Sequence, residues 1–165
     1  MNRHLFKYAG FIFLFVITIL ITSRVSYAAD DIKNINLKEL NSLLDGNKGK
    51  VVVVDLWASW CPPCKKEIPG FINLYKKYKD KGVEIIGVAL DENGSETVPP
   101  FVKKTGINYP VYLGGNDIAS QYSLNAYPTT IIYSKNGKIA NKHVGYVSEE
   151  EFDEELSKLL ENKTR

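Results

Sequence analysis

One apolar run, Val51 to Trp57, limits the possible folds of this chain more than any other segment. Its letters, VVVVDLW, are apolar on both faces of a β-strand apart from one carboxylate, and this is typical of a central strand in a sheet covered on both sides. A helical pattern runs from Pro62 toward Lys79, and a second apolar run, VEIIGVAL, follows it. A strand, a helix and a strand in this order predict a parallel, right-handed crossover. The sequence therefore predicts an α/β domain.

The flanking segments predict short helices and strands around this unit. Asn36 is placed to cap a helix in NINLKELNSLL, and Ser148 to cap a last helix in EEEFDEELSKLL. Between them we expect a loop and helix in SETVPPFVKKTG with its prolines near the start, a strand in YPVYL and a short helix in NDIASQYSL. The segment TTIIYSKNGKIANKHVG predicts a β-hairpin that turns at Asn136-Gly137.

Residues 1–28 have the features of a secretory signal peptide. Arg3, His4 and Lys7 form a basic start, an apolar stretch covers 9–22, and small residues precede a cleavage position after Ala28. The alternative is an uncleaved membrane anchor, because the apolar stretch approaches the length of a membrane span. In both cases residues 29–165 form one domain that we expect in the periplasm or on the extracytoplasmic face of the membrane.

The charge balance of the chain gives no sign of a nucleic-acid or strongly acidic partner. The net charge is +2, and without Arg3, Lys7 and Arg24 the remaining 18 basic residues face 19 acidic ones, a net charge of −1. A domain near neutrality lacks the basic field that nucleic acids require.

The two cysteines, Cys61 and Cys64, are separated by two prolines. A disulfide across so short a loop adds little stability, so this pair indicates reactivity or metal binding. Cys61 stands where the helix begins, and the positive end of a helix favours a thiolate, the form that attacks disulfides. We expect Cys61 to be the exposed attacking sulfur and Cys64, one turn further, to resolve the mixed disulfide.

The residues around this pair resemble the thioredoxin superfamily. WCPPC is preceded by Asp55, six residues before the first cysteine, and followed by Pro69; YPTT stands before the hairpin. Glu67 in CPPCKKEIP, and an extra helix and strand between 90 and 127, make the chain most similar to the exported thiol-disulfide oxidoreductases of the TlpA and ResA type, which serve cytochrome c maturation. The resemblance implies a thioredoxin fold, with a central mixed β-sheet flanked by helices and a helix-strand insertion before a cis-proline loop.

The resemblance also suggests roles for the two acids. Asp55 would lie beneath the cysteines with a raised pKa and deprotonate Cys64, whereas the alternative is a strand-end carboxylate satisfied by a loop amide. Glu67 would tune the same thiols, and its alternative is an exposed acid in the first helical turn. Two carboxylates near one dithiol would titrate as a coupled set.

Three further residues are implied in substrate binding. Pro128 would be the cis proline that faces the thiols, Tyr127 a specificity element before it, and Trp60 a partly exposed docking surface. Trp57 is expected in the core. His143 is expected to be a surface or satisfied residue, with a minority interpretation as a third copper ligand beside the thiols.

Together these features predict a thiol-disulfide oxidoreductase that acts as a reductase, with a redox-active Cys61–Cys64 disulfide and no other cofactor or metal. Pro62 and Pro63 remove two N–H groups that could stabilise a thiolate, so the pair should be a reductant. The implied partners are protein disulfides, such as the CxxCH site of apocytochrome c or of an accessory protein, and a membrane thiol-reductant donor, with the enzyme a monomer. The alternatives are a general periplasmic disulfide oxidant or isomerase, and a copper-binding carrier that uses the thiols.

Overall fold

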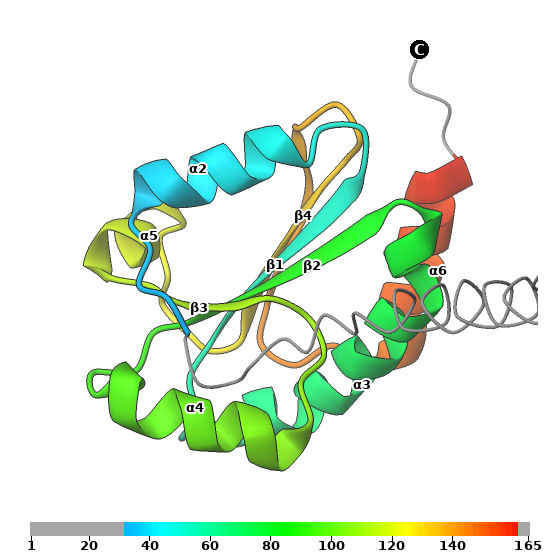
Figure 1. The fold of residues 1–165 in the computed structure, drawn as a ribbon. Coiled ribbons are helices and arrows are strands. Elements are labelled where there is room, and N and C mark those ends of the chain that lie inside the picture. The colour runs from blue at the N-terminus through cyan, green and yellow to red at the C-terminus, as the bar shows by residue number, and fades with distance from the viewer. Residues whose placement is uncertain (1–31, 162–165) are drawn as a thin grey trace, which may run out of the picture.

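The computed structural model describes residues 32–161 and contains a five-stranded mixed sheet flanked by helices (Figure 1). The strands lie in the order β3-β2-β1-β4-β5. This is the predicted thioredoxin-like fold, including the parallel crossover from β1 to β2. The elements in chain order are α2 (Leu37–Gly46), β1 (Val51–Trp57), α3 (Pro62–Tyr78), the 3-10 helix η1 (Lys79–Lys81), β2 (Val83–Ala89), α4 (Gly94–Thr105), β3 (Val111–Leu113), α5 (Asn116–Gln121), β4 (Thr129–Tyr133), β5 (Ile139–Val144) and α6 (Glu149–Glu161).

The central strand β1 is buried over its whole length, as its apolar sequence predicts. It pairs in parallel with β2 on one side and antiparallel with β4 on the other. The short strand β3 extends the sheet beyond β2, and β5 extends it beyond β4 with mostly exposed side chains. Carboxyl ends of parallel strands meet at one edge of a sheet, so the turn after β1 lies beside the turn after β2.

Helices cover both faces of the sheet (Figure 1). On one face α2 and α5 pack over an apolar cluster that contains Leu40, Leu56 and Ile118. On the other face lie α3, α4 and α6, with Phe71 of α3 and Phe152 of α6 in one cluster. The segment between β2 and the cis-proline loop supplies α4, β3 and α5, which are the helix, the strand and the short helix expected there.

Helix α3 follows its expected course, whereas helix α4 differs in detail. Helix α3 begins at Pro62, continues through Pro69 and buries Leu74, while Ile72 and Tyr75 are partly buried. Helix α4 begins at Gly94, so Pro99 and Pro100 lie inside it and not near its start. Each of these prolines lacks an N–H, and the helix continues past them with buried Val98 and Val102 packed below the sheet edge.

The predicted caps and hairpin are present. Asn36 and Glu39 form a reciprocal capping box at the start of α2. The Glu151 N–H donates to Ser148 Oγ, at 3.3 Å, in the first turn of α6. The turn between β4 and β5 has Gly137 in the left-handed region, with φ of 77°, which glycine adopts without steric cost.

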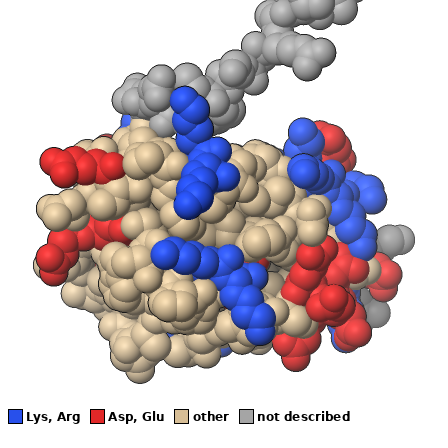
Figure 2. All heavy atoms as spheres, turned by 90° about the horizontal axis from the view of Figure 1, so that it is seen from below, with Lys and Arg blue, Asp and Glu red and all other residues tan. Residues whose placement is uncertain are grey.

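The predicted signal segment, residues 1–28, lies outside the described residues. Within residues 32–161, no helix is both long and apolar enough to cross a membrane. Figure 2 shows that basic and acidic side chains are distributed with uncharged surface between them on the face seen from below, with no broad area of a single sign. The view agrees with the near-neutral charge balance of this part of the chain.

Candidate active site

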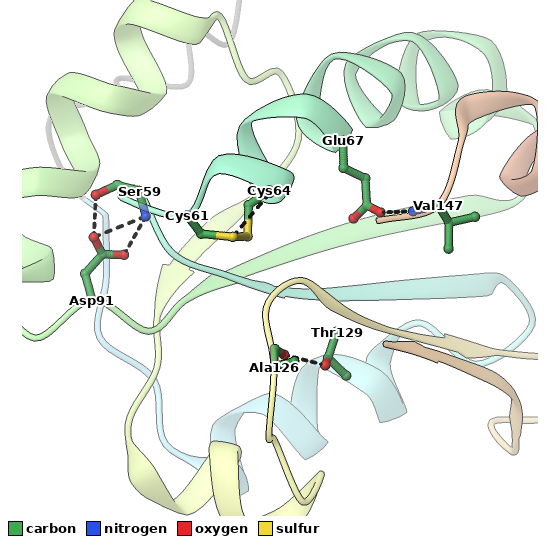
Figure 3. The surroundings of a disulfide bond; sticks show 8 residues. All are labelled: Ser59, Cys61, Cys64, Glu67, Asp91, Ala126, Thr129 and Val147. Atoms are coloured by element: carbon green, nitrogen blue, oxygen red, sulfur yellow. Dashed lines mark hydrogen bonds between the residues drawn. A yellow bond between two sulfur atoms is a disulfide. The ribbon is translucent and has the colours of Figure 1, made fainter. Parts of the chain in front are cut away.

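Cys61 and Cys64 form a disulfide at the start of α3, with their Cα atoms 5.3 Å apart (Figure 3). Cys61 is the N-cap of the helix and Pro62 occupies its first position, where a missing N–H leaves no hydrogen bond unmade. Since Pro62 and Pro63 carry no N–H, the helix offers the Cys64 N–H to Cys61 Sγ, at 3.2 Å. The predicted position of the cysteine pair at a helix N-terminus is therefore confirmed.

The expectation of an exposed Cys61 is wrong for this disulfide form. Cys61 is 2% exposed and Cys64 is 1% exposed. Both sulfurs belong to an apolar cluster with Trp57 of β1 and Val98 of α4, because α4 packs against the start of α3. A substrate must reach the sulfurs through the exposed rim of this cluster.

An unpredicted contact holds the turn that precedes Cys61. Asp91 accepts hydrogen bonds from the backbone N–H of Ser59, at 3.0 Å, and from the Ser59 hydroxyl (Figure 3). The Thr97 hydroxyl also donates to Asp91, at 3.1 Å. Ser59 follows β1 by two residues and Asp91 follows β2 by two, so the shared sheet edge is the sequence signal that could have paired them. This contact fixes the Trp60-Cys61 segment to the neighbouring strand end.

Asp55 is buried in the centre of the sheet, with 1% of its surface exposed. Its Cα is paired with Gly87 of β2 and Thr130 of β4. Asp55 Oδ1 has no hydrogen-bond partner among residues 32–161. Burial in the protein interior raises the pKa of this carboxyl well above its usual value, and the nearby Glu67 raises it further. The alternative of a satisfied carboxylate at a strand end does not describe this residue.

Glu67 is also buried, at 3% exposure, and this rules out the exposed first-turn acid considered from the sequence. Its Oε1 accepts a hydrogen bond from the Val147 N–H, at 2.8 Å (Figure 3). Burial raises the pKa of Glu67 to about 7, and the hydrogen bond from the Val147 N–H opposes the rise. Glu67 therefore changes its charge near neutral pH.

Trp60, Tyr127 and Pro128 lie together at the rim of the disulfide cluster. The Tyr127-Pro128 peptide bond is cis, as the resemblance predicts. Trp60 is 60% exposed, and its ring meets the Tyr127 ring edge to face with centroids 5.6 Å apart. Tyr127 packs against the cluster that contains both cysteines. The loop is fixed by the Thr129 hydroxyl, which donates to Ala126 O at 2.8 Å (Figure 3).

His143 lies on β5 and is engaged away from the thiols. Its Nε2 lies 2.8 Å from Glu155 Oε2, and its ring meets the Phe152 ring edge to face. Within residues 32–161, no three histidine, cysteine, aspartate or glutamate side chains gather as a metal-binding group. His143 therefore occupies the satisfied position expected of it, and Trp57 is fully buried in the core, as predicted.

The site combines a two-cysteine disulfide at a helix start with a cis-proline loop and two buried acids, and this combination defines a thiol-disulfide exchange protein with the thioredoxin fold. The sequence model of the Redoxin family matches residues 27–160, and the chain belongs to this family. It is a thiol-disulfide oxidoreductase.

Named relatives agree with this assignment. The chain is 39% identical to the thiol-disulfide oxidoreductase ResA of Bacillus cereus over 77% of its own length and 69% of the relative. It is 36% identical to ResA of Bacillus subtilis, over 72% and 68% of the two chains. Among solved structures, it resembles a thiol:disulfide interchange protein of Chlorobium tepidum with a TM-score of 0.66 and 28% identity, covering 70% of this chain and 83% of that one.

Proposed function

We propose that this chain is an exported disulfide reductase of cytochrome c maturation, with the reduced Cys61–Cys64 pair as its electron source. The observation that carries the proposal is a buried Cys61–Cys64 disulfide at a helix start, together with two buried carboxyls of raised pKa. The similarity to ResA proteins supports the ResA-type role. The substrate would be the CxxCH disulfide of apocytochrome c or a disulfide of an accessory protein.

The reaction is an exchange of two electrons and two protons. The Cys61 thiolate attacks one substrate sulfur, a mixed disulfide forms, and the other substrate sulfur leaves as a thiolate and takes a proton. Cys64 then gives its proton to a buried carboxylate and attacks Cys61 Sγ. The second substrate sulfur leaves as a thiolate and takes the proton from the carboxyl, so the substrate becomes a dithiol and the protein keeps a Cys61–Cys64 disulfide. A membrane thiol-reductant donor would restore the starting state.

The direction of transfer follows from which form of the pair the protein stabilises. Strong oxidants stabilise their thiolate and hence their reduced form. Here Pro62 and Pro63 provide no N–H, and the residues between the cysteines provide no cation. We therefore expect a reduction potential well below about −120 mV, the value of a strongly oxidising periplasmic enzyme. A potential near that value, measured against glutathione, would make the protein an oxidant.

Substrate capture tests the function directly. The Cys64→Ser variant of the full chain should accumulate a mixed disulfide through Cys61 with a CxxCH disulfide peptide, because no second thiol resolves it. The matched control is Cys61→Ser, which should capture nothing and reduce nothing. Equal capture by both variants, or reductase turnover in Cys61→Ser, would contradict the assignment of Cys61 as the attacking residue.

Export is tested separately with the N-terminal segment. Residues 1–31 fused to a reporter enzyme that folds only outside the cytoplasm should give reporter activity, because the segment has the basic start and apolar stretch of a signal. A fusion with two arginines placed in the apolar stretch is the control and should lose the activity. Equal activity of the two fusions would argue against export.

A further inference from the structure

A set of unpaired polar atoms is buried on the α3 side of the sheet. Within residues 32–161, the buried side-chain nitrogen and oxygen atoms that lack a hydrogen-bond partner are Asp55 Oδ1, Trp57 Nε1, Glu67 Oε2, Tyr109 OH and Thr130 Oγ1. Buried polar groups are nearly always hydrogen-bonded, because an unpaired one loses its hydration without compensation. The positions of these atoms relative to one another therefore decide whether they could share a hydrogen-bond partner.

The geometry brings four of these five side chains to one place, and the fifth, Glu67 of α3, is near enough for its charge to act on Asp55. Asp55 is paired across the sheet with Thr130 on one side and with Gly87 on the other. A Cβ atom at Gly87 would lie 3.1 Å from Trp57 Nε1 and 3.1 Å from a Tyr109 ring carbon, Cε2. Because Gly87 has no side chain, the Trp57 and Tyr109 rings can occupy the space beside Asp55.

Tyr109 faces both acids of the active site. It is 5% exposed, and burial raises the pKa of its hydroxyl well above the usual value, with further increases from the charges of Asp55 and then Glu67. Asp55 belongs to β1 and Glu67 to α3. The titrating groups that act on one another here are these two carboxyls and the Tyr109 phenol. Trp57, which borders this space, belongs to the same apolar cluster as Cys61 and Cys64.

Donors and acceptors are matched in this space. Trp57 Nε1 can only donate, the hydroxyls of Tyr109 and Thr130 can donate or accept, and ionised carboxylate oxygens accept. A polar space with several partners is the kind that holds an internal water. A water would let the hydroxyl of Tyr109 reach both Asp55 Oδ1 and Glu67 Oε2.

We propose that Tyr109 is a positioning residue of the active site, whose hydroxyl donates through an internal water to the buried Asp55–Glu67 carboxyl pair and sets how readily the pair accepts a proton. The inference rests on the proposed function in one respect: the proton accepted is the one that Cys64 releases. A donated hydrogen bond stabilises the ionised carboxylate. Tyr109 therefore keeps a carboxylate ready near neutral pH.

The test is a titration of the two carboxyls in the full chain. Side-chain carboxyl carbons of Asp55 and Glu67 are followed by 13C NMR in the disulfide form, in which the thiols do not titrate. Tyr109→Phe removes one oxygen and should raise the titration midpoint of the pair by at least about half a pH unit, which is roughly a threefold change in proton affinity. The matched control is Tyr122→Phe, which removes a buried hydroxyl on the opposite face of the sheet and should leave both midpoints in place.

Two results would overturn the inference. One is a set of unchanged carboxyl midpoints in Tyr109→Phe. The other is a gain in its unfolding free energy at pH 8, since loss of a truly unpaired buried hydroxyl stabilises a protein. If Tyr109→Phe does not fold, Gly87→Ala serves instead, because its methyl group would lie 3.1 Å from both the Tyr109 ring and Trp57 Nε1, should move both away from Asp55, and should raise the midpoint as well.

A kinetic measurement connects the titration to the reaction. The pH profile for the second step, in which Cys64 resolves a preformed mixed disulfide, should move to higher pH in Tyr109→Phe and stay unchanged in Tyr122→Phe. An unmoved profile in Tyr109→Phe would contradict the link to Cys64. If the wild-type protein reduces no disulfide, the proposed function fails, while the carboxyl titration still decides the role of Tyr109.

Discussion

The two faces of β1 are built for different tasks. Val52, Val54 and Leu56 point to the α2 and α5 side, where the buried tyrosine hydroxyls of Tyr122 and Tyr133 pair with each other at 2.7 Å. Asp55 and Trp57 lie on the other face, and Asp55 Oδ1 and Trp57 Nε1 have no hydrogen-bond partner within residues 32–161. One face therefore satisfies its polar groups, and the other keeps them available.

This difference separates stability from reactivity within one strand. An apolar, fully paired face lowers the free energy of the folded state. A face that holds two carboxyls of raised pKa makes the folded state less stable at neutral pH, because burial opposes their ionisation. The loss of stability at neutral pH arises in the active site, where a group that exchanges protons near pH 7 is useful for the reaction.

The largest effect should come from the stabilising face. Leu56→Ala removes a side chain with no exposed surface and leaves a cavity, so it should lower the unfolding free energy by about 3 to 4 kcal/mol. Denaturant unfolding of the disulfide form measures the loss. The pH profile of the reaction should not move. A shift of that profile would show that the two faces are coupled.

The next effect should come from the reactive face and have the opposite sign. Glu67 ionises at pH 4.5 when unfolded and at about 7 when folded, so its contribution favours folding below pH 4.5 and is lost as the pH rises to 7. Glu67→Gln keeps an acceptor for the Val147 N–H and removes the charge. It should be more stable than wild type by about 2 to 3 kcal/mol at pH 8 and similar at pH 4.

Unfolding at both pH values, with the exposed Glu96→Gln as control, checks this reversal. The control should show no such gain at pH 8, since Glu96 lies on the solvent side of α4. A Glu67→Gln variant that is less stable than wild type at pH 8 would mean that Glu67 is ionised and well stabilised in the folded protein.

The smallest effect should come from the paired tyrosines. Tyr122→Phe leaves the Tyr133 hydroxyl without its partner, so it should lower the unfolding free energy by about 1 kcal/mol. Tyr109→Phe on the other face provides the comparison, because it should shift the titration of the two carboxyls and the pH profile of the reaction. Equal and pH-independent losses in the two variants would remove the distinction between the faces.

The sequence was sufficient for the fold because its strongest signals are local. The continuous apolar run marks β1 from Val51 to Trp57, and Asn136-Gly137 marks the hairpin. Pro62 after Cys61 marks the start of α3. These features depend on neighbours in the chain, and pattern rules describe such neighbours well.

The missing parts of the site depend on contacts between distant segments. Glu67 could be an exposed or a buried acid from its spacing alone, and its hydrogen bond comes from Val147, 80 residues away. Tyr109 precedes a short strand and reads as a core aromatic; its approach to Asp55 depends on the space at Gly87. The burial of Cys61 depends on α4, which the insertion supplies.

The rate at which Cys64 resolves a preformed mixed disulfide, measured from pH 5 to 9, tests the central claim that buried carboxyls accept the Cys64 proton. In the wild-type protein the rate should rise through a midpoint near pH 7, where Glu67 titrates. In Asp55→Asn combined with Glu67→Gln it should fall on the order of 100-fold at pH 7 and lose that midpoint. An unchanged rate and midpoint in the double variant would contradict the account.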